Sequence, residues 1–197
     1  MTEEERYAQL RSDSWVRALH CFGTAFLFER RAQKLQNRVQ LLAFFGLVSP
    51  LTVGAAVLGY GVDSRLVVGL VPVAALAAVI QIILSLWGLS RAWSPSLAYA
   101  VESMSANREL FDAFQRLGER PPVAVSDLQV QYDLLVERDR FRTSQDDKAG
   151  ISEAEKRMGM RAALRQLRKA CSACGCVPTD MKATECGVCG QFRIWRI

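Results

Sequence analysis

The sequence predicts an all-α membrane protein: a two-helix transmembrane hairpin with long juxtamembrane and cytosolic helices, followed by a small cysteine-rich module. Two long segments without a charged residue, 41–62 and 66–90, lie only a few residues apart. The segments around them repeat apolar residues at the three- and four-residue spacing of helices. Near the C-terminus, two Cys-x-x-Cys-Gly motifs stand eleven residues apart.

Both uncharged segments are long enough to cross a membrane. Each exceeds the roughly 20 residues that a helix needs to cross a hydrocarbon layer of about 30 Å. The short segment between them holds Asp63 and Arg65. We therefore expect spans over 41–62 and 66–90 that form one hairpin at 41–90. The alternative is a pair of buried helices in a soluble bundle, but such helices rarely lack charge over this length.

The charges beside the hairpin predict its orientation. Residues 2–6 are mainly acidic where the start of a signal peptide would be basic, so no secretory signal is expected. In the connecting segment, Asp63 offsets Arg65. Since positive residues resist translocation, we expect both termini in the cytosol and the hairpin in the inner (plasma) membrane. Basic residues stand at the outer ends of the hairpin: Arg30, Arg31, Lys34, Arg38 and Arg91.

Residues 1–40 are predicted to form an N-terminal juxtamembrane region. Apolar residues at helical spacing indicate one helix over 13–40, which Asp13 or Ser14 can cap. This helix holds His20, the only histidine of the chain. With no second ligand candidate nearby, ordinary helix packing is expected for that side chain.

Residues 91–150 are predicted to form a cytosolic helical region. One amphipathic helix ends at Gly118, just before two consecutive prolines. A second helix begins near Ser126 or Asp127, and a polar loop or linker follows over 143–150.

Residues 151–197 are predicted to combine a basic helix with the cysteine module. Ser152 and Glu155 fit a capping box at the start of this helix. Residues 161–197 hold seven basic and two acidic residues, and such a tail can bind nucleic acid, anionic lipid or an acidic protein. A row of arginines forms either an ordinary solvated face or a contact to nucleic acid or lipid: Arg157, Arg161, Arg165 and Arg168.

Small and polar residues interrupt both predicted spans. Gly46, Pro50 and Gly54 recur at four-residue spacing in the first, and Gly69, Ala77, Gln81 and Ser85 share a side of the second. Small residues let helix backbones approach closely, either within one hairpin or between several in a homo-oligomer. An amide facing lipid is costly, so Gln81 should face a bundle interior or a pore. The candidate membrane-interface or pore residues are Gly46, Gly54, Gln81 and Ser85.

The cysteine motifs predict a metal site. Cytosolic thiols seldom form lasting disulfides, and four of them can hold zinc in a tetrahedron at about 2.3 Å. The glycine after each motif permits a left-handed backbone. A bend at 178–180 and a strand-like end at 191–197 would complete a small zinc ribbon with structural Zn²⁺. Cys176 could replace a neighbouring ligand, and iron is the alternative metal. The predicted ligands are Cys171, Cys174, Cys186 and Cys189.

No enzyme is expected. The chain has a single histidine, and no paired carboxylates, nucleophile–base set or phosphate-binding glycine loop stands out. Hydrolytic metal chemistry would need an open metal position and a nearby base.

The spacing Cys171-x2-Cys174-x11-Cys186-x2-Cys189 resembles that of the mobilome CxxCx(11)CxxC proteins. Over roughly 14–140, the hairpin and its helices resemble the SLATT proteins, bacterial two-transmembrane effector domains that occur with nucleotide-synthesising and sensing partners in conflict systems. The resemblance implies a membrane-disrupting or channel-forming effector that stays quiet until a cytosolic signal arrives during phage infection. A nucleotide-synthesising or reverse-transcriptase system would be its partner.

Two functions therefore follow as hypotheses. The first is an oligomerising membrane effector, pore-forming or membrane-disrupting, of an anti-phage or mobile-element conflict system. The second is a membrane-tethered adaptor or sensor whose zinc module binds nucleic acid or a partner protein.

Overall fold

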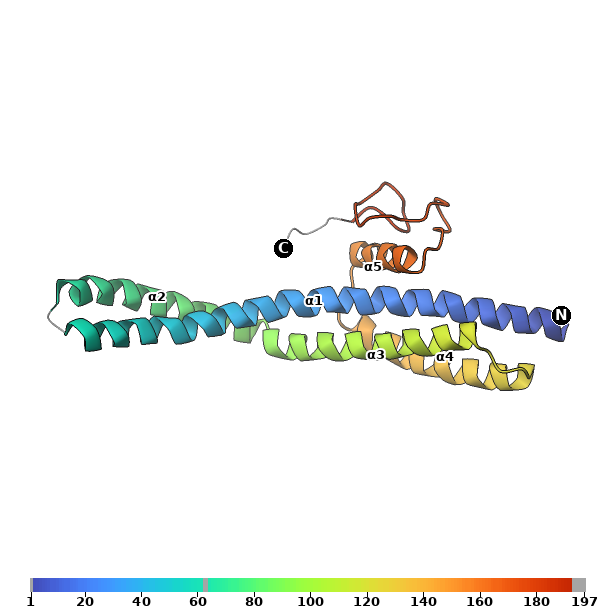
Figure 1. The fold of residues 1–197 in the computed structure, drawn as a ribbon, viewed down its shortest axis with the longest axis horizontal. Coiled ribbons are helices and arrows are strands. Elements are labelled where there is room, and N and C mark those ends of the chain that lie inside the picture. Colours follow the sequence, from blue (N-terminus) through green and yellow to red (C-terminus); the bar gives the residue numbers. More distant parts are fainter. Residues whose placement is uncertain (1, 62–63, 193–197) are drawn as a thin grey trace. The chain divides into compact units, whose positions relative to one another are not determined.

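The computed structural model describes residues 2–61 and 64–192, and within these ranges it contains helices and no β-strand. Figure 1 shows their order along the chain. The helices are α1 (Glu3–Tyr60), α2 (Arg65–Ser90), α3 (Trp93–Glu119), α4 (Val125–Asp147) and α5 (Glu153–Gln166). The chain divides into two compact units, the first from the N-terminus to Arg31 together with the residues from Ala100 onward, the second Ala32–Tyr99.

Helix α1 begins ten residues earlier than the sequence pattern indicates. The Thr2 hydroxyl accepts a bond from the Glu5 N–H (3.2 Å), while the Glu5 carboxylate accepts one from the Thr2 N–H (2.8 Å). This reciprocal pair is a capping box, and acidic residues in the first turn suit the positive end of a helix. The predicted cap at Asp13 or Ser14 is wrong. Ser14 is buried inside α1 and donates its hydroxyl to the Leu10 carbonyl (2.8 Å).

In the first unit, α1 packs against α3 and α4 through apolar side chains. Phe22 of α1 meets Phe111 of α3 edge to face, with ring centroids 5.2 Å apart. Phe114 of α3 lies against Tyr132 of α4 in the same geometry. A second cluster joins the same three helices farther toward the N-terminus: Leu10, Leu117 and Leu128. The predicted helices on either side of Gly118 are thus confirmed, and their apolar faces form a core.

A buried polar network extends α4 beyond its predicted end. The Asp146 carboxylate accepts bonds from the Ser103 hydroxyl (2.6 Å), the Asn107 amide (2.7 Å) and the Arg142 guanidinium (3.1 Å). These bonds hold the last turn of α4 against α3. The expected loop over 143–150 is therefore mostly helix, because tertiary partners satisfy the polar residues that suggested a loop.

Helix α5 crosses α1 where two glycines meet. A Cβ built on Gly159 would lie 2.5 Å from the Gly23 carbonyl oxygen, so the backbones approach too closely for any side chain. The predicted capping box of α5 is present: Ser152 and Glu155 bond to each other's backbone N–H groups. The same Glu155 carboxylate takes two 2.8 Å bonds from the Arg31 guanidinium of α1. The crossing and the ion pair fix α5 on α1.

The second unit is a hairpin of apolar helices. In α1 none of the most apolar 18 residues is buried, and in α2 only 6 % of the corresponding 18 residues are buried. These two stretches are therefore not core helices of the chain itself. Both helices are long and apolar enough to cross a membrane. The Ser64 side chain caps α2 by accepting a bond from the Val67 N–H (3.2 Å). The predicted span 41–62 falls in the last part of α1 and the span 66–90 in α2, and residues 62–63 lie outside the described ranges.

Candidate metal centre

The four predicted ligands come together in space. Their sulfur atoms all lie within 4.8 Å of one another. The Cys171 and Cys186 sulfurs are 3.9 Å apart, and those of Cys174 and Cys189 are 3.8 Å apart. In a tetrahedral site with metal–sulfur bonds of about 2.3 Å, each sulfur–sulfur edge measures about 3.8 Å. The arrangement therefore fits a metal ion held by four thiolates.

Each motif folds into the same turn. The Gly175 N–H donates to the Cys171 carbonyl (2.8 Å), and the Gly190 N–H donates to the Cys186 carbonyl (2.9 Å). At Gly175 the φ of 67° is in the left-handed region, as the sequence predicted. At Gly190 this prediction is wrong, because its φ is not in the left-handed region; glycine is needed there because a Cβ would clash with the carbonyl oxygen of Thr184.

The turns also favour the thiolate form of Cys186. The backbone N–H groups of Cys189 and Val188 lower the pKa of Cys186 to about 6. The thiolate is the form that binds metals, and it dominates at neutral pH when the pKa is this low. At Cys189, burial acts in the opposite direction and raises the pKa to about 12. A cation among the four sulfurs would favour the thiolate at both positions.

The centre has a buried side and an open side. Cys171 and Cys189 are buried against Leu19 of α1 and Leu164 of α5, whereas Cys174 is exposed. The cysteine module therefore shares its apolar packing with the helices of the first unit. The sulfurs contribute directly to that core.

Arg161 of α5 ties the module to its helix. Its side chain is only 7 % exposed. The guanidinium donates to the Asp180 carbonyl (2.9 Å), to the Asp180 carboxylate (3.1 Å) and to the Cys189 carbonyl (3.3 Å). Sequence reasoning grouped Arg161 with exposed arginines and missed this role. The sequence did hold a signal that Arg161 is buried, namely the small residues around it: Gly159, Ala162 and Ala163. Such residues mark a helix that packs closely on several sides.

The four predicted arginines do not form one row. Arg157 donates to the Gln191 side chain (3.2 Å), and Arg165 is exposed in the last turn of α5. Arg168 is exposed beyond the end of the helix, with a φ of 51°. Only the last two present an exposed cation beside the module, while Arg161 is buried.

The remaining cysteine-module predictions have mixed outcomes. The Cys176 thiol is exposed and bonds to the Cys174 carbonyl (3.5 Å), and it is not one of the four grouped sulfurs. Residues 171–192 form turns and bends without a strand, so a ribbon is not formed in this part. Most of the expected strand-like end lies outside the described residues.

His20 is exposed on α1, apart from the four thiols.

A groove of about 670 Å³ runs between α1 and α2 in the second unit. Gly46, Pro50, Gln81 and Ser85 line it, so four of the predicted span residues meet there. A Cβ on Gly46 would lie 2.7 Å from the Gln81 amide nitrogen, so the end of this side chain lies directly over the glycine. The described lining does not include Gly54.

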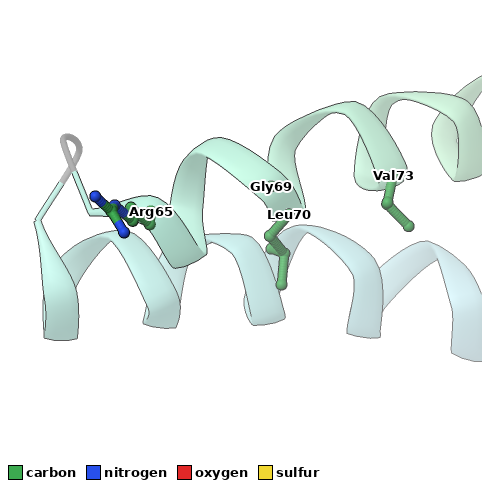
Figure 2. A pocket seen from close by; sticks show the side chains of 4 residues that line it. All are labelled: Arg65, Gly69, Leu70 and Val73. Carbon is green, nitrogen blue, oxygen red and sulfur yellow. The ribbon is translucent and has the colours of Figure 1, made fainter.

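On α2 the groove is lined by Ala74 and Ala78 rather than by the predicted Gly69 and Ala77. A four-residue repeat drifts around a helix with 3.6 residues per turn, so the predicted set does not stay on one face. Gly69 instead lines a separate hollow of about 510 Å³ at the start of α2. Figure 2 shows it with Arg65, the single charged residue among its described lining residues.

Comparison with known proteins gives one result. The family model described as mobilome CxxCx(11)CxxC protein matches residues 11–192, which include both cysteine motifs and all or part of every helix. No curated protein and no solved structure matches the chain. The resemblance to this family is thereby confirmed, and the resemblance to SLATT proteins stays a prediction.

Proposed function

The chain belongs to the mobilome CxxCx(11)CxxC proteins, and on that premise we propose that it is an oligomerising membrane effector of a mobile-element or anti-phage conflict system. In this proposal the hairpin spans the inner membrane with both termini in the cytosol. Several hairpins assemble into a pore or a membrane-disrupting patch when a cytosolic signal arrives. The SLATT resemblance of the hairpin and its helices agrees with such a role.

The exposed apolar surface of the hairpin carries this proposal. Large side chains along both helices are half exposed or more, among them Leu47, Leu58, Val73, Ile83 and Leu89. Soluble monomers rarely expose continuous apolar patches beyond a few hundred Å². A bilayer removes this surface from water, and both helices satisfy their own backbone groups as the hydrocarbon layer requires.

The groove between α1 and α2 supports assembly. Gln81 and Ser85 place polar groups along a surface that is otherwise apolar. In lipid, polar side chains of this kind are stabilised by partners on neighbouring helices, each contributing about 0.6–2 kcal/mol. Packed against other copies, the groove residues would line the interior of an oligomer.

The metal we propose at the four cysteines is zinc. Four thiolates complete its tetrahedral shell, so every position is taken by the protein and the role is structural. An ion there would fold the knuckles and hold them on α5 and α1. Because no position is left open and no catalytic set is proposed, we propose a protein that is not an enzyme.

Membrane depolarisation tests the effector proposal. Cells that express the chain should depolarise, and vesicles that contain it should leak upon activation. The variant Gln81→Leu/Ser85→Leu should lose most of this effect, because it removes the polar groups of the groove. Thr52→Val is the matched control: it removes a hydroxyl that bonds to its own helix at 2.7 Å and does not line the groove. Equal depolarisation by the leucine variant and the parent would remove the polar groove from the mechanism.

A membrane-tethered adaptor is the second candidate. Arg165 and Arg168 are exposed beside the module, and such cations can bind nucleic acid or an acidic protein. The full chain in detergent should then bind DNA or RNA with an affinity that falls steeply with salt. No binding at low salt would exclude nucleic acid as its partner. A neighbouring gene for a nucleotide-synthesising enzyme or a reverse transcriptase would favour the effector and identify its partner system.

A further inference from the structure

Cationic and aromatic side chains gather at one end of the second unit. They flank the apolar stretches of α1 and α2 on the side away from the connecting segment at 61–64, and we name them the girdle: Lys34, Arg38, Trp87, Arg91 and Trp93. Within the sequence of Ala32–Tyr99 the only acidic residue is Asp63, which stands between the two apolar stretches. The girdle therefore has three positive charges and no acidic residue of this unit near it in sequence.

Trp93 fills the corner where three helices of this unit meet. The Arg38 guanidinium of α1 lies over its ring, 5.4 Å from the centroid. The rings of Trp87 and Trp93 have centroids 6.4 Å apart. A Cβ on Gly88 would lie 2.9 Å from the Trp93 ring, so glycine lets the ring pack against α2. Arg38 is thus positioned by stacking on an aromatic ring.

The turn between α2 and α3 fixes the backbone of Arg91. Only Arg91 and Ala92 separate the two helices. The Arg91 N–H bonds to the Trp87 carbonyl (2.9 Å), and the Ala92 N–H bonds to the Leu89 carbonyl (3.0 Å). Ala92 has a φ of 50°, a left-handed conformation that alanine adopts at a cost. The backbone of Arg91 is therefore held by a bonded turn and not by a flexible linker.

The nearby arginines of α1 have other roles. The Arg31 guanidinium is occupied by Glu155 and by the carbonyls of Ala149 and Gly150 in the first unit. Arg30 lies over the ring of Phe26. At the end of the second unit away from the connecting segment, the described cations that adjoin the apolar helices are those of the girdle, whereas Arg65 stands at the start of α2.

The chemistry of the girdle matches that of an anionic membrane surface. Tryptophan rings sit at the headgroup level, with an apolar body toward the acyl chains and an N–H toward water. Clustered Lys and Arg residues beside a span attract anionic lipids. A guanidinium can stack on an aromatic ring and still donate to a phosphate, which an ammonium group does less well.

We propose that the girdle binds the phosphate groups of anionic phospholipids in the cytosolic leaflet, with Arg38 and Arg91 as the phosphate contacts and Trp93 as the residue that positions Arg38. The proposal rests on the proposed function in one respect, the insertion of the hairpin into a bilayer. It adds a preferred lipid class and the residues that recognise it.

Tryptophan quenching tests the proposal on the full chain in vesicles. In the background Trp15→Phe/Trp195→Phe, the only remaining tryptophans are Trp87 and Trp93. Brominated phosphatidylglycerol should quench them roughly twofold more than the same mole fraction of brominated phosphatidylcholine, because the anionic lipid is enriched at the girdle. Equal quenching by the two lipids would overturn the proposal. Quenching by neither would instead contradict the insertion of the hairpin.

Charge variants assign the contact. Arg38→Gln/Arg91→Gln should abolish the preference for phosphatidylglycerol, whereas Arg116→Gln/Arg120→Gln, which removes two exposed charges of the first unit, should keep it. A preference that survives in the first variant would overturn the assignment. Arg38→Lys/Arg91→Lys keeps both charges and should retain part of the preference. If the lysine variant lost the preference for phosphatidylglycerol completely, the loss would come from disrupted packing around Trp93. That result would also count against phosphate binding.

Discussion

The Arg161 guanidinium donates to the carbonyl oxygen of Cys189, 3.3 Å away, while it also holds both the carbonyl and the carboxylate of Asp180. A single buried cation thus connects α5 to Cys189, one of the proposed metal ligands, and to the segment between the two motifs. The candidate metal centre is therefore continuous with the helical core. Arg161 makes these contacts through oxygen atoms of the cysteine module.

Arg161→Gln should weaken metal binding without removing a ligand. Outer groups that orient ligands typically account for 10–100-fold in affinity, and we expect a loss of that order here. Cobalt(II) titration of the full chain, followed by its thiolate charge-transfer band against a competing chelator, measures the change. Arg165→Gln is the matched control, because that side chain is exposed on the same helix. Equal affinities for the two variants would show that Arg161 does not position the site.

Cys186→Ser should abolish tight metal binding, whereas Cys176→Ser should leave it intact. The first removes one of four grouped sulfurs, and the second removes an exposed thiol outside the group. Metal analysis of the purified chain should find about one zinc per chain in the parent and in Cys176→Ser, as expected for a four-thiolate site. A metal content that falls equally in both variants would place Cys176 among the ligands.

Local signals in the sequence were sufficient for several features. The cysteine spacing predicted which four sulfurs meet, because a Cys-x-x-Cys turn is built from neighbouring residues. The capping box at Ser152 likewise predicted the start of α5. The capping box depends on contacts within three residues. The cysteine cluster joins two local turns whose paired sulfurs belong to residues 15 positions apart, and the shared motif was the signal that the turns meet.

Features that depend on distant segments were missed. The polar residues at the end of α4 suggested a loop because Ser103 and Asn107, their partners on α3, lie about 40 positions away. Arg161 looked like a solvated cation because its acceptors belong to the module that folds back onto α5. The start of α1 was different: Thr2 and Glu5 supplied a local signal that was present and not used.

Gly159→Ala should destabilise the first unit. The added methyl would press on the Gly23 backbone, which cannot rotate away as a side chain can. Overpacking of this kind costs about 1–3 kcal/mol. Thermal unfolding of the full chain in detergent, monitored by protease resistance of the first unit, should show the loss. Gly54→Ala is the control, because a Cβ there meets nothing within 4 Å among the described residues, and it should unfold like the parent.

Glu155→Gln should destabilise the chain at neutral pH and much less in acid. Burial opposes ionisation of Glu155, but bonds from Arg31 and Ser152 outweigh it and lower the pKa of this carboxyl. A group with a depressed folded-state pKa contributes stability above its unfolded pKa of about 4.3, and loses it as pH falls through the folded value. The parent should therefore unfold at a higher temperature than Glu155→Gln at pH 7, and the gap should narrow below about pH 4.3.

Glu153→Gln serves as the control for this pH effect. Glu153 pairs with Lys156 on an exposed face of α5, and exposed pairs of this kind contribute little. Its unfolding temperature should stay near that of the parent at both pH values. If Glu155→Gln and Glu153→Gln behaved alike, the link between Arg31 of α1 and the first turn of α5 would make no measurable contribution. A loss of unfolding temperature in Glu155→Gln that Glu153→Gln does not share would show that the start of α5 holds Arg31, the last α1 residue of the first unit.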